Sequence, residues 1–227
     1  MQEQDFISAM AGHILSAARA NAGKAPSERH LAEHFSVSRG QVREALAILE
    51  AMQVIERRAK SGIYLNEDGG GIEAMAFLAR AGLPLENRQI YEAVEVRKIH
   101  EIKAAELAAD RATDENFDRL RAILAQSEEK LAEGKGLDTL DQAFHLEIVR
   151  ATQNTVFLNI CTAFYELSQQ RLAVYFRDPE RNRKSHEEHK QIFEALVNRD
   201  PDLASALMVS HLRGAMSYWT ELLAPEG

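Results

Sequence analysis

The chain contains 227 residues, of which 45% are hydrophobic and 27% are charged, so its composition is that of a folded globular protein rather than a disordered one. Its single cysteine, Cys161, excludes an intramolecular disulfide, and no run approaches the ~20 apolar residues that a membrane span needs. The opening residues MQEQDFISAM lack the basic and then apolar layout of a secretory signal. We therefore expect a cytoplasmic protein with no membrane partner.

The formal net charge of −8 argues against a uniformly basic nucleic-acid binder, because counterion release rewards positive charge. The charge is unevenly distributed, however, since residues 19–60 are locally basic. Their 8 basic residues are Arg19, Lys24, Arg29, Arg39, Arg43, Arg57, Arg58 and Lys60, against the 5 acidic residues Glu28, Glu33, Glu44, Glu50 and Glu56. An interaction with nucleic acid is therefore expected in this segment.

Three helices are predicted in the N-terminal part of the chain. Apolar residues recur at helical spacing over residues 6–15. Ser27 is suited to cap a short second helix, and Ser38 to cap a third, with Gln41 three residues later completing a capping box. The tight connection at residues 35–37 joins the last two helices in helix-turn-helix geometry. Two short β-prone runs, at residues 54–58 and 63–65, then predict a hairpin that would form a wing.

The third predicted helix carries two arginines, Arg39 and Arg43, outside its apolar stripe and near its N-terminal end. An arginine at this position can donate two hydrogen bonds to guanine O6 and N7, and a helix N-terminus favours phosphate. The alternative is that both are ordinary solvated residues at a helix start. The helix-turn-helix context favours a recognition helix.

Three domain segments are expected. Residues 1–68 form the winged helix-turn-helix, residues 69–71 form a glycine linker, and residues 72–227 form an all-α antiparallel bundle. A bundle of this size can enclose a cavity for a ligand or metal. The fold class is thus mainly α, and the predicted helices of the bundle span residues 72–81, 87–112, 115–133, 137–152, 154–176, 182–198 and 201–223.

The second half also contains a candidate metal site. Asp141 and His145 lie four residues apart, so both side chains project from one face of a helix. His189 and His211 supply two more imidazoles from later helices, and three histidines with one aspartate suit Zn²⁺ or Ni²⁺ with open positions for water or ligand oxygens. The alternative is a structural or solvent-facing role, because residues 30–34 contain a histidine pair with the same spacing.

The motifs PSERHLAE at residues 26–33 and VSRGQVREAL at residues 37–46 resemble the signature of the GntR superfamily of transcriptional regulators. The resemblance implies operator-contacting arginines and a glycine at the wing tip. Gln53 stands where the family usually has glycine, and Ala25 where leucine is customary. The candidate DNA-binding residues are Arg29, Ser38, Arg39, Gln41, Arg43, Lys60 and Gly62.

The helical half resembles the FCD ligand-binding domain of FadR-type GntR regulators. The resemblance rests on the order Asp141-x3-His145, then Glu188-His189 and finally His211, together with Glu95-Val96-Arg97, Glu101 and the alanine-rich residues 104–109. It implies a divalent metal, with Zn²⁺ or Ni²⁺ as the expected ion, and it makes His189 rather than His186 the ligand. The implied metal ligands are Asp141, His145, His189 and His211.

The same resemblance makes Arg97 a candidate partner for an effector carboxylate. The alternative is an ordinary i,i+4 ion pair between Arg97 and Glu101. His100, where an apolar residue is more usual, and Asn154 and Arg171 are further candidates for effector binding.

The function expected from these features is that of a transcriptional regulator and not of an enzyme. It would bind a palindromic operator as a homodimer, because one recognition helix reads a half-site, and a small carboxylate bound at the metal would control its affinity. Two alternatives remain. In the first, the metal itself is the signal. In the second, the histidines His145, His189 and His211 activate a metal-bound water in an enzyme.

Overall fold

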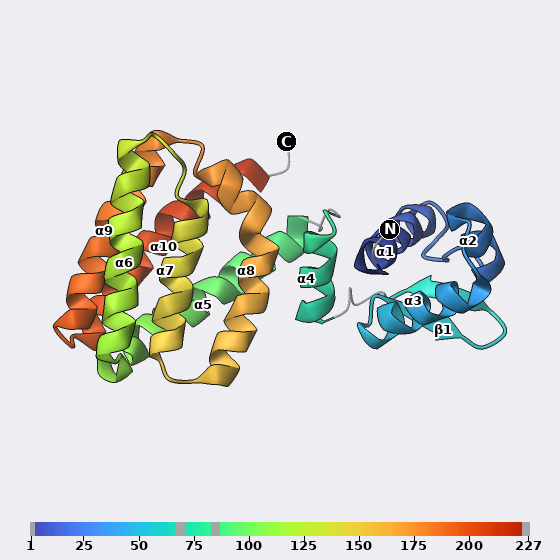
Figure 1. Cartoon of the computed structure of the whole chain (residues 1–227), viewed down its shortest axis with the longest axis horizontal. Coiled ribbons are helices and arrows are strands. Elements are labelled where there is room, and N and C mark those ends of the chain that lie inside the picture. Colours follow the sequence, from blue (N-terminus) through green and yellow to red (C-terminus); the bar gives the residue numbers. More distant parts are fainter. Residues whose placement is uncertain (1–2, 67–70, 83–86, 224–227) are drawn as a thin grey trace. The chain divides into compact units, whose positions relative to one another are not determined.

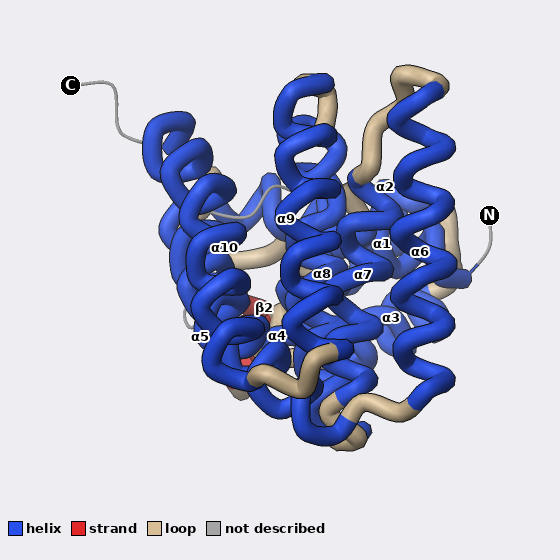
Figure 2. The backbone as a smooth tube through the Cα atoms, turned by 90° about the vertical axis from the view of Figure 1, so that its left-hand side faces the viewer, coloured by secondary structure: helices blue, strands red, loops and turns tan. Residues whose placement is uncertain are grey.

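The computed structural model describes residues 3–66, 71–82 and 87–223, and the chain divides into two compact units, Met1–Leu85 and Glu86–Gly227. Each unit has an apolar core of its own. Helices predominate in both, and the described β-structure is one short hairpin in the N-terminal unit with an isolated bridge between Lys24 and Tyr64 (Figures 1 and 2). The predicted fold class, a winged helix-turn-helix followed by a helical domain, is confirmed.

The N-terminal unit contains three helices, a hairpin and a fourth helix. These elements are α1 (Glu3–Arg19), α2 (Glu28–Phe35), α3 (Arg39–Ala51), β1 (Ile55–Arg58), β2 (Gly62–Leu65) and α4 (Ile72–Arg80). The two strands pair antiparallel, with Ile55 opposite Leu65 and Arg58 opposite Gly62. The inner face of α3 is buried in the same core as α1 and α2, through Val42, Ala45, Leu46 and Leu49 with Met10, Ile14 and Leu31.

Side-chain caps fix where α2 and α3 begin. The backbone N–H of His30 donates to Ser27 Oγ at the start of α2. At the start of α3, Gln41 N donates to Ser38 Oγ at 3.2 Å and Ser38 N donates to Gln41 Oε1 at 3.1 Å. This reciprocal pair is the predicted capping box, and it satisfies backbone donors that the first turn leaves without partners.

The helix α4 belongs to the N-terminal unit, although the sequence pattern assigned it to the helical bundle. Its residues Ala74 and Phe77 are buried in the same core cluster as the apolar residues of the winged helix-turn-helix. The pattern was apolar and helical, and such a pattern does not specify which core receives it. Of the predicted linker, residues 69–70 lie outside the described residues, while Gly71 is the N-cap of α4.

Gln53 follows α3 with a left-handed backbone, φ +60°, which explains why glycine is customary there. A side chain in this region costs about 1–2 kcal/mol, whereas the extra freedom of an unfolded glycine costs about 0.5–1 kcal/mol. Because the Gln53 side chain is exposed, Gln53→Gly should raise the free energy of unfolding of the N-terminal unit by about 0.5–1 kcal/mol. Denaturant unfolding followed by circular dichroism measures this change.

The matched control is Ala51→Gly, because Ala51 is also exposed but belongs to the last turn of α3. Glycine there should lower the free energy of unfolding by about 0.5–1 kcal/mol. If both variants lose stability to the same extent, the backbone of residue 53 is not strained.

The C-terminal unit consists of six described helices. They are α5 (Asn87–Arg111), α6 (Asp114–Ala132), α7 (Asp138–Ala151), α8 (Thr155–Tyr175), α9 (Pro179–Val197) and α10 (Pro201–Leu223). Helix α7 packs against α5, α6 and α8, and α10 packs against α5 and α9 (Figure 1). The four buried alanines of α5 allow its neighbours to approach closely, and they are Ala104, Ala105, Ala108 and Ala109. Because α7 contacts three of the other helices, it is central to this unit.

One helix start differs from the sequence prediction. The helix α9 begins at Pro179 rather than at residue 182, because Asp178 accepts a hydrogen bond from the N–H of Glu180 and proline suits the first helical position. None of the described helices combines the length and apolar character that a bilayer crossing demands.

Candidate nucleic-acid interface and metal centre

The recognition helix α3 presents its first turns to solvent. Arg39, Gln41 and Arg43 are exposed, whereas the opposite face is buried. Arg39 makes no ion pair or side-chain hydrogen bond within the described part of the chain, so its guanidinium is available to a ligand. Ser38 and Gln41 are engaged in the capping box, so their direct role is to fix the helix start that aims Arg39.

The other two candidate arginines are tethered to carboxylates of α2. Arg43 donates from Nε to Glu28 Oε2 at 2.8 Å, and this hydrogen bond raises the pKa of Arg43. Arg29 lies 3.4 Å from Glu33 and is highly exposed. A phosphate or base edge must compete with these exposed ion pairs, which are weak in water.

The wing is organised around Tyr64, which is not among the residues predicted from the sequence to bind DNA. The Tyr64 hydroxyl lies 2.7 Å from Ser61 Oγ, and the guanidinium of Arg58 lies 4.3 Å from the centre of its ring. Lys60 is exposed with φ +59°, and Gly62 has φ +128°, a region that favours glycine. The available signal in the sequence was an aromatic residue that follows the three basic residues Arg57, Arg58 and Lys60 in a hairpin.

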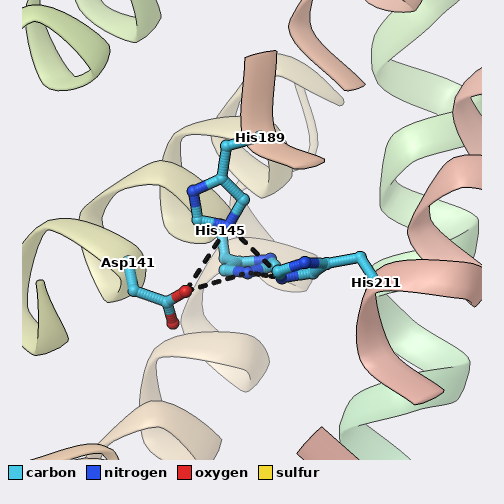
Figure 3. A group of neighbouring side chains, drawn as sticks. All are labelled: Asp141, His145, His189 and His211. Atoms are coloured by element: carbon cyan, nitrogen blue, oxygen red, sulfur yellow. Dashed lines mark hydrogen bonds and ion pairs between the residues drawn. The ribbon is translucent and has the colours of Figure 1, made fainter. Parts of the chain in front are cut away.

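In the C-terminal unit, the four predicted ligands converge on one point (Figure 3). Asp141 and His145 come from α7, His189 from α9 and His211 from α10. The Nε2 atom of His211 lies 3.2 Å from that of His145 and 3.3 Å from that of His189, while Asp141 Oδ1 lies 3.4 Å from His189 Nε2. All four ligand atoms lie within 4.8 Å of one another.

These separations fit a metal centre. Bonds of about 2.0–2.1 Å to one ion place neighbouring ligand atoms about 3 Å apart at right angles and about 3.4 Å apart in a tetrahedron. Three imidazole nitrogens and a carboxylate are also the donor set that divalent transition metals prefer. Burial, with a contribution from His211 and His145, lowers the pKa of His189 well below its usual value, so His189 is neutral and its lone pair can bind a metal. The cluster could therefore hold a divalent ion.

Two carboxylates orient the histidines from behind. Glu188 Oε2 lies 2.7 Å from His211 Nδ1. Glu101 Oε2 lies 2.9 Å from His145 Nδ1, as an ion-pair contact without the alignment of a hydrogen bond. A hydrogen bond of the Glu188 kind holds the Nδ1 proton and directs the Nε2 lone pair toward a metal, whereas the nearby Glu101 carboxylate favours a proton on His145 Nδ1 by its charge.

Glu101 is the hub of a buried network. Arg97 donates from Nε to Glu101 Oε1 at 2.5 Å, and the hydroxyl of Tyr165 donates to the same oxygen. Burial would raise the pKa of Glu101, but Arg97 and His145 lower it well below its usual value. Glu101 is therefore a buried anion held by three partners. The role of Tyr165 could not be predicted from the sequence, because its partner lies on another helix 64 residues away.

Arg97 forms the ion pair with Glu101 that was the alternative to effector binding. It also lines a small pocket beside the metal ligands, with Asp141, Ser185 and Glu188, and its Nη2 lies 4.0 Å from Asp141 Oδ2. The cavity volume of about 30 Å³ is enough for one or two water molecules. An organic acid would require side chains around this pocket to move.

The remaining effector candidates lie elsewhere or outside the described side chains. His100 packs edge-on against the rings of Phe157 and Phe164 and does not line the pocket. Asn154 is exposed and accepts a hydrogen bond from Phe157 N as the N-cap of α8, so the structure does not bring it to the metal ligands. Arg171 lies in α8, but its side chain is outside the described part of the structure.

The N-terminal unit is a winged helix-turn-helix with an exposed arginine on its recognition helix, and a helical domain follows it. This combination defines the class of DNA-binding transcription regulators. Residues 12–65 match the gntR family of bacterial regulatory proteins, and residues 92–214 match the FCD domain. The chain belongs to the gntR family, with an FCD domain as its C-terminal part. It is thus a DNA-binding transcriptional regulator, and the predicted family is confirmed.

Relatives and solved structures agree with this membership. The transcriptional regulator LutR of Bacillus subtilis is 31% identical over 194 residues, covering 83% of this chain and 88% of LutR. The transcriptional repressor NanR of Cronobacter sakazakii is 30% identical over 208 residues, covering 87% of this chain and 77% of NanR. The solved structure of Lar of Listeria monocytogenes shares the fold with a TM-score of 0.67 at 19% identity, covering 95% of this chain and 97% of that one.

Proposed function

We propose that this regulator is controlled by a small organic acid that binds at a divalent metal in the FCD domain. The observation that carries the proposal is the convergence of Asp141 Oδ1 with the Nε2 atoms of His145, His189 and His211 beside the pocket that Arg97 lines. Zn²⁺ and Ni²⁺ suit these ligands, and a bound ion would leave positions open for oxygen atoms of an acid.

Arg97 has two roles in this proposal. Its ion pair with Glu101 holds the network behind His145, and its Nη2 group lies close enough to the pocket to meet the carboxylate of an acid. A charge-assisted contact with a carboxylate would add specificity for acids over neutral ligands. His100 and Arg171 lie on the helices α5 and α8 that flank the network, and they are kept as more distant candidates.

Regulation then follows from differential binding. An acid that binds one arrangement of the helices more tightly shifts the population toward it, and a changed separation of two winged heads changes their fit to a palindromic operator. The domains and relatives are those of transcription regulators rather than enzymes, so a metalloenzyme is not proposed.

The experiment that tests the function is a titration of operator binding, followed by fluorescence anisotropy. Metal-free protein receives Zn²⁺ or Ni²⁺ alone, and then a panel of monocarboxylic, dicarboxylic and hydroxy acids. We expect operator affinity to change at least about fivefold on addition of one acid to metal-loaded protein, as typical allosteric coupling implies. A full response to metal alone, with none to any acid, would instead identify a metal sensor.

A homodimer is proposed because a palindromic operator has two half-sites. The supporting observation is a set of exposed aliphatic side chains on α5 and α8, where Ile99 is 63%, Val156 66% and Ile160 43% exposed. Val156 and Ile160 lie four residues apart on one face of α8.

Val156→Asp should therefore raise the dissociation constant of the dimer at least about tenfold, because it places a charge in an apolar contact. Analytical ultracentrifugation measures this constant. The matched control is Val197→Asp, since Val197 is exposed to 42% on α9. An unchanged dimer in the first variant would place the interface elsewhere, and a monomeric wild-type protein would remove the dimer from the proposal.

A further inference from the structure

A second pocket is lined by other residues of α9 than those that line the pocket beside the metal ligands. Its volume is about 660 Å³, which is within the usual range for small-molecule sites of about 300–1,000 Å³ and far above that of the pocket beside the metal. Its walls come from the end of α6 with the turn that follows, the start of α7, the end of α8 and the start of α9. A Cβ on Gly136 would lie only 3.2 Å from the carbonyl oxygen of Phe176, so glycine permits the close approach of two of these walls.

The interior of this pocket contains a buried imidazole without a partner. His186 is 3% exposed, and neither of its ring nitrogens has a hydrogen-bond partner. A buried polar atom without a hydrogen-bond partner destabilises the folded state, so an arrangement of this kind calls for an explanation. A ligand that displaces the side chains covering these nitrogens would supply partners, and the apolar side chains of Leu131 and Phe176 would contact its body.

The rim of the pocket carries charges of both signs that form no close ion pair in the described part of the structure. Arg177 and Arg183 make no ion pair, and neither do Glu128 and Asp138. The two other charged lining residues are already engaged, because Lys135 lies 2.5 Å from Glu133 and Glu187 lies 2.8 Å from Lys190. Free cations and free anions around an apolar floor match a ligand that carries both charges and an apolar part.

We propose that this pocket binds a small zwitterion with an apolar side chain, of the α-amino acid class. Its carboxylate meets Arg177 and Arg183, and its ammonium group lies toward Glu128 and the imidazole of His186. The apolar side chain packs on Phe176. Phe176 also lines the pocket beside the metal. The bound zwitterion therefore contacts a side chain that the two pockets share.

The test is calorimetry on the full-length, metal-loaded protein with L-leucine and L-phenylalanine as probes. We expect saturable binding of at least one probe with Kd below about 1 mM. Isocaproate, which lacks the ammonium group, and isoamylamine, which lacks the carboxylate, should bind at least tenfold more weakly than leucine. If isocaproate binds as well as leucine, the proposed zwitterion is wrong, and if neither amino acid binds, the proposal is overturned.

Two neighbouring variants locate the site. Arg183 lines this pocket, whereas Lys184 lines the pocket beside the metal, and both side chains are exposed cations on α9. Arg183→Ala should weaken leucine binding at least tenfold, while Lys184→Ala should leave it within twofold. The reverse result would assign the binding to the metal pocket and would overturn the proposal without affecting the proposed function.

Discussion

His189→Ala should lower the affinity for Zn²⁺ or Ni²⁺ by more than about 100-fold, because removing a residue that merely orients a ligand already costs 10–100-fold. His189 contributes one of three Nε2 atoms and lies 3.4 Å from Asp141 Oδ1. The variant should also lose the stabilisation that the metal confers on the folded state, which is about 2.7 kcal/mol when the free metal is at 100 times its Kd. Calorimetric titration and the shift of the melting temperature with metal measure both effects.

His186→Ala is the matched control, because His186 lies on the same helix, is similarly buried and does not belong to the cluster. Its metal affinity should stay within about twofold of the wild-type value. Loss of metal binding in His186→Ala with retention in His189→Ala would show that the ligand set is wrong. The melting temperature of both variants without metal separates loss of a ligand from loss of the fold.

Arg39→Ala should weaken specific operator binding by about 10–100-fold, the value of one bidentate contact to a base of about 1–3 kcal/mol. Arg39 is exposed at the N-terminal end of α3 and makes no ion pair within the described residues, so all of its interaction energy is available to DNA. Arg43→Ala should cost less, since binding by Arg43 must disturb its hydrogen bond to Glu28. Fluorescence anisotropy with operator and with unrelated DNA separates specific from non-specific binding.

Arg121→Ala provides a control with the same change in net charge, because Arg121 is exposed on α6 and pairs with Asp118. Its operator affinity should remain near that of the wild type. Equal loss of affinity for operator and unrelated DNA in Arg39→Ala would reassign Arg39 to a phosphate contact, with a salt dependence reduced by about one unit of slope. No loss at all would contradict the assignment of α3 as the recognition helix.

Most of the fold could be predicted from residues that are close together in the sequence. Ser38 and Gln41 specify the start of α3 through a capping box, and Asp178 with Pro179 specifies the start of α9, where the sequence analysis placed it too late. These features depend on residues that are close in the chain. The assignment of α4 to a core depends on which distant apolar face receives Ala74 and Phe77, and helical periodicity contains no such information.

The metal ligands were proposed from their types and spacing, and the structure brings them together. The network of Glu101, Arg97 and Tyr165 behind them was harder to predict from the sequence. Glu101 and Arg97 are neighbours on one helix, so their ion pair was foreseeable, but Tyr165 reaches Glu101 from α8. Asn154 illustrates the opposite case, because a polar residue at a helix start is most simply a cap. The pocket that contains His186 could not be foreseen, since four separate segments form its walls.

In the proposed mechanism, occupancy of the FCD domain and binding of operator DNA are thermodynamically linked. The most direct test is calorimetry with the acid that changes operator affinity most, on metal-loaded protein alone and with saturating operator. Linkage requires the Kd of the acid to change by the same factor by which the acid changes operator affinity, at least about fivefold. An identical Kd with and without operator would show that the two sites are not coupled.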